Sequence, residues 1–304
     1  MKGLKRRVSI IICIMLAFML VSCNLKKGEN KETQKNIKIT DSYGKELAFE
    51  KAPERIVSLS PGATETIYAL NKENTLVGRS DFDDYPTAVS KIKSVGGVKD
   101  PSIEKITELK PDLVIGGAHF SKDTVKKLED LGIKVAVLYG AEDLDGAYKN
   151  IMDISTILGV TEKGQTIVDG MKKKVESVEN KVKSLNKSRI YYMVDFGKAD
   201  FSAGGDTFIG KMIEKAGGDN IAKDTKGWNY SFEKIVENKP EMIILSDKFN
   251  TKKNFLTADK YKELPASKAN KVYEIDDNML LRQGPRQADG LEALAKIIHP
   301  EAFK

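Results

Sequence analysis

A 13-residue segment occurs twice in the chain, and this repeat limits the folds that the sequence can adopt. Residues 103–115, IEKITELKPDLVI, recur as residues 232–244, FEKIVENKPEMII, with seven of 13 positions identical. Each copy predicts a short helix, a Lys-Pro stop and a buried strand, because proline cannot continue a helix and biases the preceding residue toward extended geometry. Two copies so far apart predict two similar α/β lobes.

Between the copies lies a segment with a single apolar stripe at helical spacing, from Thr161 to about Leu185. The stripe consists of Ile167, Met171, Val175, Val178, Val182 and Leu185. Lysines and glutamates occupy the opposite face. A helix of this length would reach roughly 35–40 Å, enough to run along two lobes and join them. A surface helix within one domain is the alternative.

Short β-rich apolar runs alternate with helical stretches elsewhere, which predicts an α/β fold with parallel strands. These runs are residues 56–59, 113–115, 135–138, 190–194 and 242–245. The sequence therefore predicts an N-terminal α/β lobe over residues 37–160, a backbone helix over 161–186 and a C-terminal α/β lobe over 187–304.

The N-terminus has the pattern of an export signal. Four basic residues before position 8 precede an apolar run of 14 residues, Val8 to Val21, too short to span a bilayer comfortably. The run ends in Leu-Val-Ser-Cys23, which resembles the bacterial lipobox. That resemblance implies a lipoprotein signal peptide over residues 1–22 and a diacylated Cys23 that anchors the protein to the outer face of the cell membrane. A plain secretory signal or a short anchor is the alternative.

Export also changes the charge and the cysteine count. The only other cysteine, Cys13, lies inside the signal, so the mature chain contains no disulfide. Removal of residues 1–22 takes away four positive charges and no negative ones, which lowers the net charge from +6 to +2. A nucleic-acid partner is not expected at this charge. Residues 23–36 are polar and predict a solvated tether.

The repeat places one glutamate in the first turn of each predicted short helix, Glu104 and Glu233. Acids at helix starts are common because they interact favourably with the helix dipole. A matched pair on two similar lobes would also suit a partner that is itself two-fold symmetric.

Further motifs resemble one known family. They are residues 55–65 (RIVSLSPGATE), 76–86 (LVGRSDFDDYP), 95–97 (VGG), the first repeat, 282–286 (RQGPR) and 291–300 (LEALAKIIHP). In order and spacing they are similar to the iron-siderophore/cobalamin family of ABC-transporter solute-binding proteins. The resemblance implies the class III periplasmic-binding-protein fold, in which two Rossmann-like α/β lobes share one rigid backbone helix. It also implies a ligand cleft between the lobes and little hinge motion.

The same resemblance implies partners. Glu104 and Glu233 match the surface glutamates that dock onto arginines of a dimeric permease, which works with separate ATPase subunits. The carrier itself is expected to be an extracytoplasmic monomer. It is expected to need no cofactor of its own, although its ligand would contain cobalt or iron.

The resemblance also implies which residues line the cleft: Phe82, Tyr85, Phe201, Trp228 and Arg282. Aromatic side chains on loops after parallel strands are well placed to cover a flat macrocycle or chelate. Arg282 could clamp a carboxylate or phosphate with its planar guanidinium, or form a structural salt bridge. Arg286, after Gly-Pro, is expected to be structural.

A corrinoid is the preferred ligand, because the SPGATE, DYP and GPR segments look closest to cobalamin carriers. A ferric siderophore or haem remains the alternative. Two positions depart from the Gram-negative cobalamin carriers: Val98 and Gly116-Gly117 stand where those carriers have tryptophans.

Other functions are less consistent with the sequence. A carrier of bare zinc or manganese would need several clustered histidines, whereas the chain has only His119 and His299, far apart. Nucleophile-elbow, phosphate-loop and dinucleotide-binding motifs are absent, so an enzyme is not expected. A sensor or adhesin on the same scaffold could lose the paired glutamates, and their presence favours transport.

Overall fold

The computed structural model describes residues 37–196, 200–248 and 251–304. The predicted signal peptide, Cys23 and the predicted tether lie outside these residues. Ile37–Lys304 is one compact unit. Within its described part, no helix combines the length and the apolar character needed to cross a bilayer.

Four parallel strands form the sheet of the N-terminal lobe. In spatial order they are β4 (Leu76–Arg79), β3 (Ile56–Leu59), β5 (Leu113–Gly116) and β6 (Val135–Val137). Every residue of β3, β5 and β6 is buried, as expected for a parallel sheet covered on both faces. One face packs against α2 (Pro61–Ala69) and α5 (Leu144–Ile157), and the other against α3 (Ile103–Glu108) and α4 (Lys122–Asp130).

The C-terminal lobe repeats this architecture around a five-stranded sheet. The strands β11 (Val272–Ile275), β10 (Met242–Ser246), β7 (Arg189–Asp195) and β9 (Asp219–Asn220) pair in parallel, and β8 (Phe201–Ser202) pairs antiparallel to β7. The predicted α/β class with parallel strands and two lobes is confirmed.

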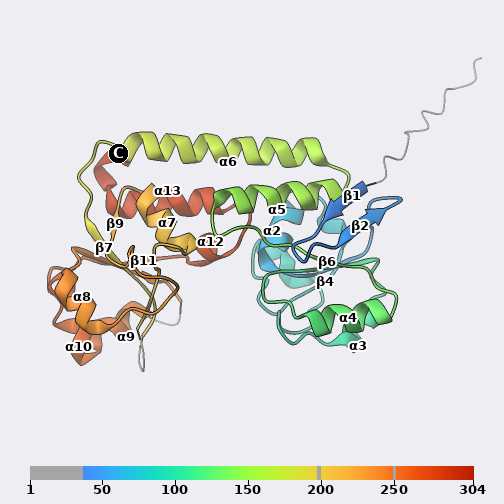
Figure 1. Cartoon of the computed structure of the whole chain (residues 1–304), viewed down its shortest axis with the longest axis horizontal. Coiled ribbons are helices and arrows are strands. Elements are labelled where there is room, and N and C mark those ends of the chain that lie inside the picture. Colours follow the sequence, from blue (N-terminus) through green and yellow to red (C-terminus); the bar gives the residue numbers. More distant parts are fainter. Residues whose placement is uncertain (1–36, 197–199, 249–250) are drawn as a thin grey trace, which may run out of the picture. The chain divides into compact units, whose positions relative to one another are not determined.

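The remaining elements cover these sheets or connect them (Figure 1). The helices are α7 (Phe208–Lys215), α8 (Phe232–Asn238), α9 (Thr251–Thr257), α10 (Asp259–Lys262), α11 (Pro265–Lys268), α12 (Asn278–Leu281) and α13 (Gln287–Ile298). A hairpin of β1 (Ile37–Thr40) and β2 (Glu46–Phe49) packs on the N-terminal core, and short 3-10 turns cover Glu73–Thr75, Thr87–Lys91 and Pro300–Phe303.

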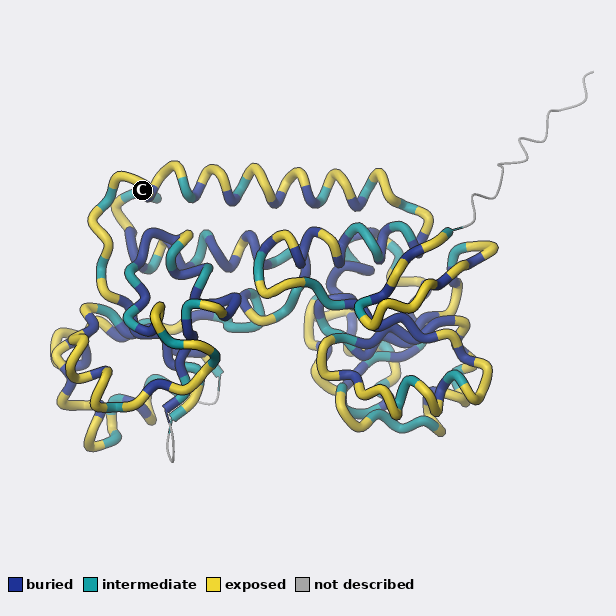
Figure 2. The backbone as a smooth tube through the Cα atoms, in the orientation of Figure 1, coloured by how far each residue is buried: buried dark blue, intermediate teal, exposed yellow. Residues whose placement is uncertain are grey.

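The long helix α6 runs from Thr161 to Val182, about 33 Å at 1.5 Å per residue. Of the predicted stripe, Met171, Val175, Val178 and Val182 are buried. Figure 2 shows the outer side of α6 as exposed, and the exposed residues of the helix include lysines and glutamates. The buried stripe packs against α5 of the N-terminal lobe and α13 of the C-terminal lobe. The helix therefore contacts both lobes along its length.

A second helix also joins the lobes. The start of α5 belongs to the core of the C-terminal lobe, where Leu144, Tyr148 and Ile151 are buried with α6 and α13. Its end belongs to the N-terminal core, where Ile154 and Ile157 are buried with α2 and β3. Because one helix contributes to both cores, relative movement of the lobes would disturb packed side chains.

The internal repeat corresponds to two copies of one structural unit, α3–β5 and α8–β10. Ser102 and Ser231 cap the two helices, each accepting a hydrogen bond from a backbone amide three residues on. In the N-terminal lobe the repeat strand β5 pairs with β3, which directly follows Arg55. In the C-terminal lobe the repeat strand β10 pairs with β7, which begins with Arg189. The Nε atoms of these arginines lie 3.1 Å from the carbonyl oxygens of Lys110 and Lys239.

The Lys-Pro stop differs from its prediction. Lys110 and Lys239 were expected to be extended before proline, but their φ angles are +46° and +45°. A left-handed residue reverses the chain at the helix end and exposes its carbonyl. In each lobe the arginine hydrogen bond to that carbonyl stabilises the unusual conformation, so a residue 55 or 50 positions away overrides the local preference.

Candidate ligand-binding cleft

The carboxyl ends of β3, β5 and β6 converge on a cavity of about 580 Å³. This volume lies within the range of roughly 300–1,000 Å³ found for small-molecule sites. The N-terminal lobe contributes the start of α2, the turn after β5 and the loop after β6. The C-terminal lobe contributes the start of α7, Trp228 and the segment 278–283, so the cavity is a cleft between the lobes.

Two predicted aromatic residues line this cleft. Phe82 of the N-terminal lobe is 58% exposed and Trp228 of the C-terminal lobe is 37% exposed, so both present ring surface to the cavity. The Trp228 backbone is held by a hydrogen bond from the amide of Ser202 to its carbonyl, at 2.7 Å. Large aromatic surfaces without a protein partner are suited to a flat ligand.

Tyr85 and Phe201 are not among the residues that line the cleft. The Tyr85 ring lies under the guanidinium of Arg286, 4.1 Å from ring centroid to Cζ. Phe201 is half-buried on β8, where it bridges to Asn229. These positions leave Phe82 and Trp228 as the two predicted aromatics that the structure brings together with Arg282.

Arg282 lines the cleft, but its guanidinium is already paired. Its Nη1 lies 3.0 Å from the Glu65 carboxylate and 2.6 Å from the Asp84 carboxylate, and its Nη2 donates to the Phe82 carbonyl at 3.0 Å. Both acids belong to the N-terminal lobe, so the arginine forms an ion pair across the cleft. Arg282 was predicted to be either a ligand clamp or a structural salt bridge. Its pairing with Glu65 and Asp84 corresponds to the structural salt bridge.

Arg286 binds the same glutamate. Its Nε and Nη2 donate to the two Glu65 oxygens at 2.9 and 2.7 Å, and its Nη1 donates to Asp276 at 3.1 Å. The Glu65 side chain is only 2% exposed. Bidentate arginine–carboxylate pairs are both strong and geometrically specific, so this cluster links the two lobes beside the cleft-lining Arg282.

Gln283 adds a neutral link between the lobes. Its Oε1 accepts from the amide of Gly140 at 2.7 Å and from the Asn150 side chain at 3.0 Å, and its Nε2 donates to the Ala141 carbonyl at 3.0 Å. The backbones also approach closely, since a Cβ on Gly62 would lie 2.6 Å from the Gln283 carbonyl oxygen. Only glycine fits at this contact.

Apart from Arg282, the polar residues that line the cleft were not predicted from the sequence, and His119 and Gln287 are two of them. His119 is exposed on the turn after β5. Gln287 is fully buried, and its Oε1 has no hydrogen-bond partner among the described residues. The position of His119 directly after a parallel strand was a usable signal. No pattern in the sequence distinguishes Gln287.

Glu104 and Glu233 are both exposed in the first turns of α3 and α8. Neither lines the cleft. Hydrogen bonds from its own backbone amide and from Ser231 lower the pKa of Glu233. Figure 1 shows α3 and α8 on the side of the two lobes that faces away from α6.

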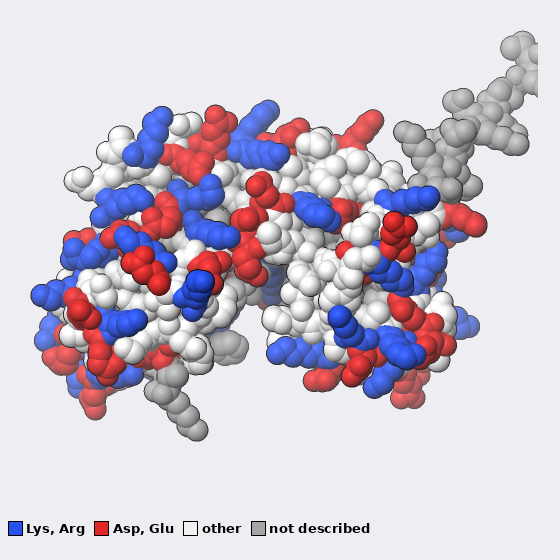
Figure 3. Space-filling view, viewed as in Figure 1, with Lys and Arg blue, Asp and Glu red and all other residues white. Residues whose placement is uncertain are grey.

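Over the face shown in Figure 3, lysines and arginines are interspersed with acids on both lobes. No broad area of one sign is visible there. Recognition by this face would therefore depend on individual charged pairs.

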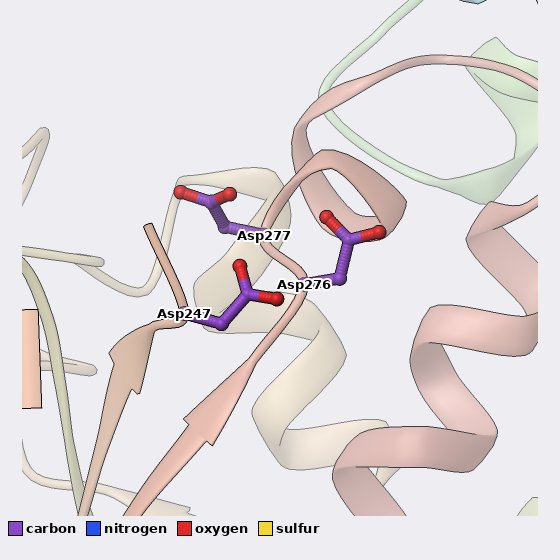
Figure 4. A group of neighbouring side chains, drawn as sticks. All are labelled: Asp247, Asp276 and Asp277. Atoms are coloured by element: carbon purple, nitrogen blue, oxygen red, sulfur yellow. The ribbon is translucent and has the colours of Figure 1, made fainter. Parts of the chain in front are cut away.

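Three acids of the C-terminal lobe, Asp247, Asp276 and Asp277, lie close enough to share an ion (Figure 4). Lys248 lies 3.1 Å from Asp247 and 3.2 Å from Asp276, and Arg286 also binds Asp276. Burial alone would raise the pKa of Asp276, but Lys248 and Arg286 outweigh it and lower the pKa. Lys248 and Arg286 thus already pair with two of the three acids, Asp247 and Asp276.

Comparisons with known proteins agree with this architecture. A family model described as periplasmic binding protein matches residues 56–279. The chain is 32% identical over 315 residues to the uncharacterized ABC transporter substrate-binding lipoprotein YvrC of Bacillus subtilis, covering 99% of this chain and all of that one.

Two solved structures share the fold. One, described as a possible iron-binding (periplasmic solute-binding) protein from Staphylococcus epidermidis, has a TM-score of 0.73 at 28% identity and covers 82% of this chain and 100% of that one. The other, the periplasmic vitamin B12-binding protein of Vibrio cholerae, has a TM-score of 0.70 at 27% identity and covers 83% of this chain and 98% of that one. Since the family model matches most of the chain and the two-lobed cleft is present, the chain belongs to the periplasmic binding protein family, whose members bind solutes and are not enzymes.

Proposed function

We propose that this protein is the solute-binding component of an ABC importer and that its ligand is a corrinoid. The observation that carries the choice of ligand is the charge of the cleft. Among the described lining residues, the charged side chains are Glu142 and Arg282. Arg282 is 11% exposed and is neutralised by Glu65 and Asp84, whereas the Glu142 carboxylate has no partner among the described residues. The described lining residues therefore include no unpaired arginine or lysine that could bind an anionic ligand.

Neutral hydrogen-bonding groups supply the remaining polarity. Ser60, Asn150, Asn278, Gln283 and Gln287 line the cleft with hydroxyl and amide groups. A corrinoid carries carboxamide side chains around a flat ring, so amides and aromatic surfaces complement it. Haem carries two propionates and catecholate siderophores carry several negative charges, and both would require arginine or lysine partners. The similarity to the Vibrio cholerae vitamin B12-binding protein supports the same choice.

Binding can be measured through the only tryptophan, because Trp228 lines the cleft. Cobalamin and cobinamide absorb visible light and should quench its fluorescence on binding. Titration with these corrinoids, haemin, and one anionic and one neutral ferric siderophore would rank the ligands. We expect the corrinoids to bind tightest. Stronger quenching by haemin or a siderophore would contradict the choice of a corrinoid, and quenching by none would contradict the cleft.

Delivery to a permease is the second part of the proposal. Glu104 and Glu233 occupy equivalent first turns of the two repeat helices, and both are exposed outside the cleft. Such a pair suits a dimeric permease that presents one basic site to each lobe. Exposed charge pairs at the rim of an interface mainly set register and association rate, which suits a carrier that docks and releases repeatedly.

The anchor completes the proposal. Diacylation of Cys23 would hold the protein at the outer face of the membrane, beside the permease. The lipoprotein similarity supports this assignment. Cys23→Ala should leave an unprocessed precursor or release protein into the medium, and a normally processed, membrane-bound variant would contradict it.

A further inference from the structure

One side chain in the cleft has a metal-coordinating atom that the protein does not use. The His119 imidazole lines the cleft and is exposed. Within the described parts of the chain, no hydrogen bond or ion pair to this ring is found. Neutral imidazole is the commonest metal ligand in proteins.

The turn that carries His119 is held in place on both sides. Residues 117–120 form a turn closed by a hydrogen bond from the Phe120 amide to the Gly117 carbonyl, at 3.0 Å. Phe120 is 1% exposed, and its carbonyl accepts a hydrogen bond from the Tyr43 hydroxyl at 2.6 Å. Ser121 then caps α4. The histidine is therefore an exposed residue of an anchored turn.

The two glycines before His119 make this arrangement possible. A Cβ on Gly116 would lie 2.5 Å from the Phe120 ring, and one on Gly117 would lie 3.2 Å from Ser60 Oγ. A larger side chain at Gly116 would displace Phe120 and with it the turn. The two glycines thus allow Phe120 and Ser60 to pack closely against the backbone of the turn that carries the imidazole.

We infer that the His119 imidazole is an axial ligand to the cobalt of the bound corrinoid. This inference rests on the proposed function. Coordination is a ligand exchange at cobalt: the cobalt–oxygen bond to a coordinated water breaks, a cobalt–nitrogen bond to His119 forms and the water leaves. Neither the metal nor the protein is oxidised or reduced.

The consequence is selectivity among corrinoids. A corrinoid with an exchangeable water at cobalt can accept the imidazole, whereas one whose axial positions hold tightly bound cyanide cannot. The protein should therefore prefer aquo forms over cyano forms of the same corrinoid. Ring stacking on Phe82 and Trp228 would not by itself distinguish these forms.

The spectrum of the ligand tests this directly, because replacing water by imidazole shifts the visible bands of a Co(III) corrinoid. The protein should be purified without a polyhistidine tag. His119 is then the only exposed histidine of the described chain, since His299 is 3% exposed and lies 3.0 Å from the Gly217 carbonyl oxygen. Diaquocobinamide and dicyanocobinamide are the probes. The variants are His119→Gln and His119→Ala, with Glu108→Gln, at an exposed acid of α3 that does not line the cleft, as the control.

We expect bound diaquocobinamide to show the imidazole-type shift in the parent and in Glu108→Gln, and not in either His119 variant. Affinity for diaquocobinamide should fall by about tenfold or more in His119→Gln, with little change for dicyanocobinamide. Trp228 quenching without a band shift in the parent would overturn the inference and leave the proposed function standing. An unchanged shift in His119→Gln would also overturn it. Absence of both quenching and shift would overturn both.

Discussion

Arg286 donates two hydrogen bonds to Glu65, at 2.9 and 2.7 Å, although the residues lie in different lobes and 221 positions apart. With Arg282 on the same carboxylate, the pair forms a buried ion cluster that reaches the cleft at Arg282. Removal of one member of such a cluster leaves uncompensated charge in the interior.

Glu65→Ala should therefore lower the free energy of unfolding by roughly 3 kcal/mol, as for a broken buried ion pair. Urea unfolding followed by circular dichroism would measure this change. The matched control is Glu54→Ala, which removes a fully exposed pair with Lys51 and should leave the free energy of unfolding almost unchanged. Equal effects of the two substitutions would show that the cluster contributes little to stability.

Asp83 should make stability depend on pH. It is 4% exposed and accepts hydrogen bonds from the Ser80 amide, at 2.9 Å, and from the Ser80 hydroxyl. Burial raises its pKa despite these hydrogen bonds. At pH values between the pKa of Asp83 in the unfolded chain and its higher pKa in the folded protein, the folded state holds the proton more often than the unfolded state does. The contribution of Asp83 to the free energy of unfolding therefore falls as the pH rises through this interval.

Asp83→Asn keeps an acceptor oxygen but cannot ionise. It should raise the melting temperature at neutral pH relative to the parent and have a smaller effect at acidic pH, where the parent carboxyl is protonated. Thermal unfolding of both proteins across this pH range would test the prediction. A variant that is less stable than the parent at neutral pH would contradict it.

The cleft has room for another stacking surface at Val98, which lines it. Val98→Trp should tighten corrinoid binding by several-fold, because aromatic contacts contribute roughly 0.5–1.5 kcal/mol beyond their buried area. Val98→Leu is the control for added apolar volume alone. Calorimetric titration with cobinamide would decide, and weaker binding by the tryptophan variant would mean that the ligand does not reach this wall.

The Glu104→Ala/Glu233→Ala variant should bind the ligand normally but fail to deliver it to the permease. Ligand affinity should be unchanged, because neither residue lines the cleft. Uptake should fall by at least about tenfold, and by more than in either single variant, because both contacts of a two-point attachment are lost. High salt should mimic part of the loss, since exposed pairs are screened over roughly 8–10 Å.

Glu108→Ala is the matched control for that experiment, because Glu108 is an exposed acid at the other end of α3. It should leave uptake unchanged. Normal uptake by the double variant would mean that the repeated glutamates act only as helix-start acids. Weakened ligand binding would mean that they contact the cleft.

Much of the fold was predictable because its signals are local. The 103–115 and 232–244 repeat predicted α3–β5 and α8–β10, and the apolar stripe predicted a helix that starts at Thr161. The left-handed Lys110 and Lys239 were not predictable. Their conformation depends on hydrogen bonds from Arg55 and Arg189, which no local pattern reveals.

The cleft was predictable only in part for the same reason. Trp228 stands in a polar segment, and Phe82 belongs to a recognisable loop, so both could be proposed from sequence. The pairing of Arg282 with Glu65 joins positions 217 apart, and the contact of Tyr85 with Arg286 also crosses between lobes. These contacts depend on how the lobes pack, which periodicity and composition do not specify.

The molecule that co-purifies with the protein is the most direct test of the central claim. The full chain should be purified from its native host without denaturation, and any bound small molecule should be identified by visible absorption and mass spectrometry. We expect a cobalt corrinoid in about equimolar amount in the parent protein, and none in a Trp228→Ala/Phe82→Ala variant. Haem or a ferric siderophore in the parent protein would contradict it.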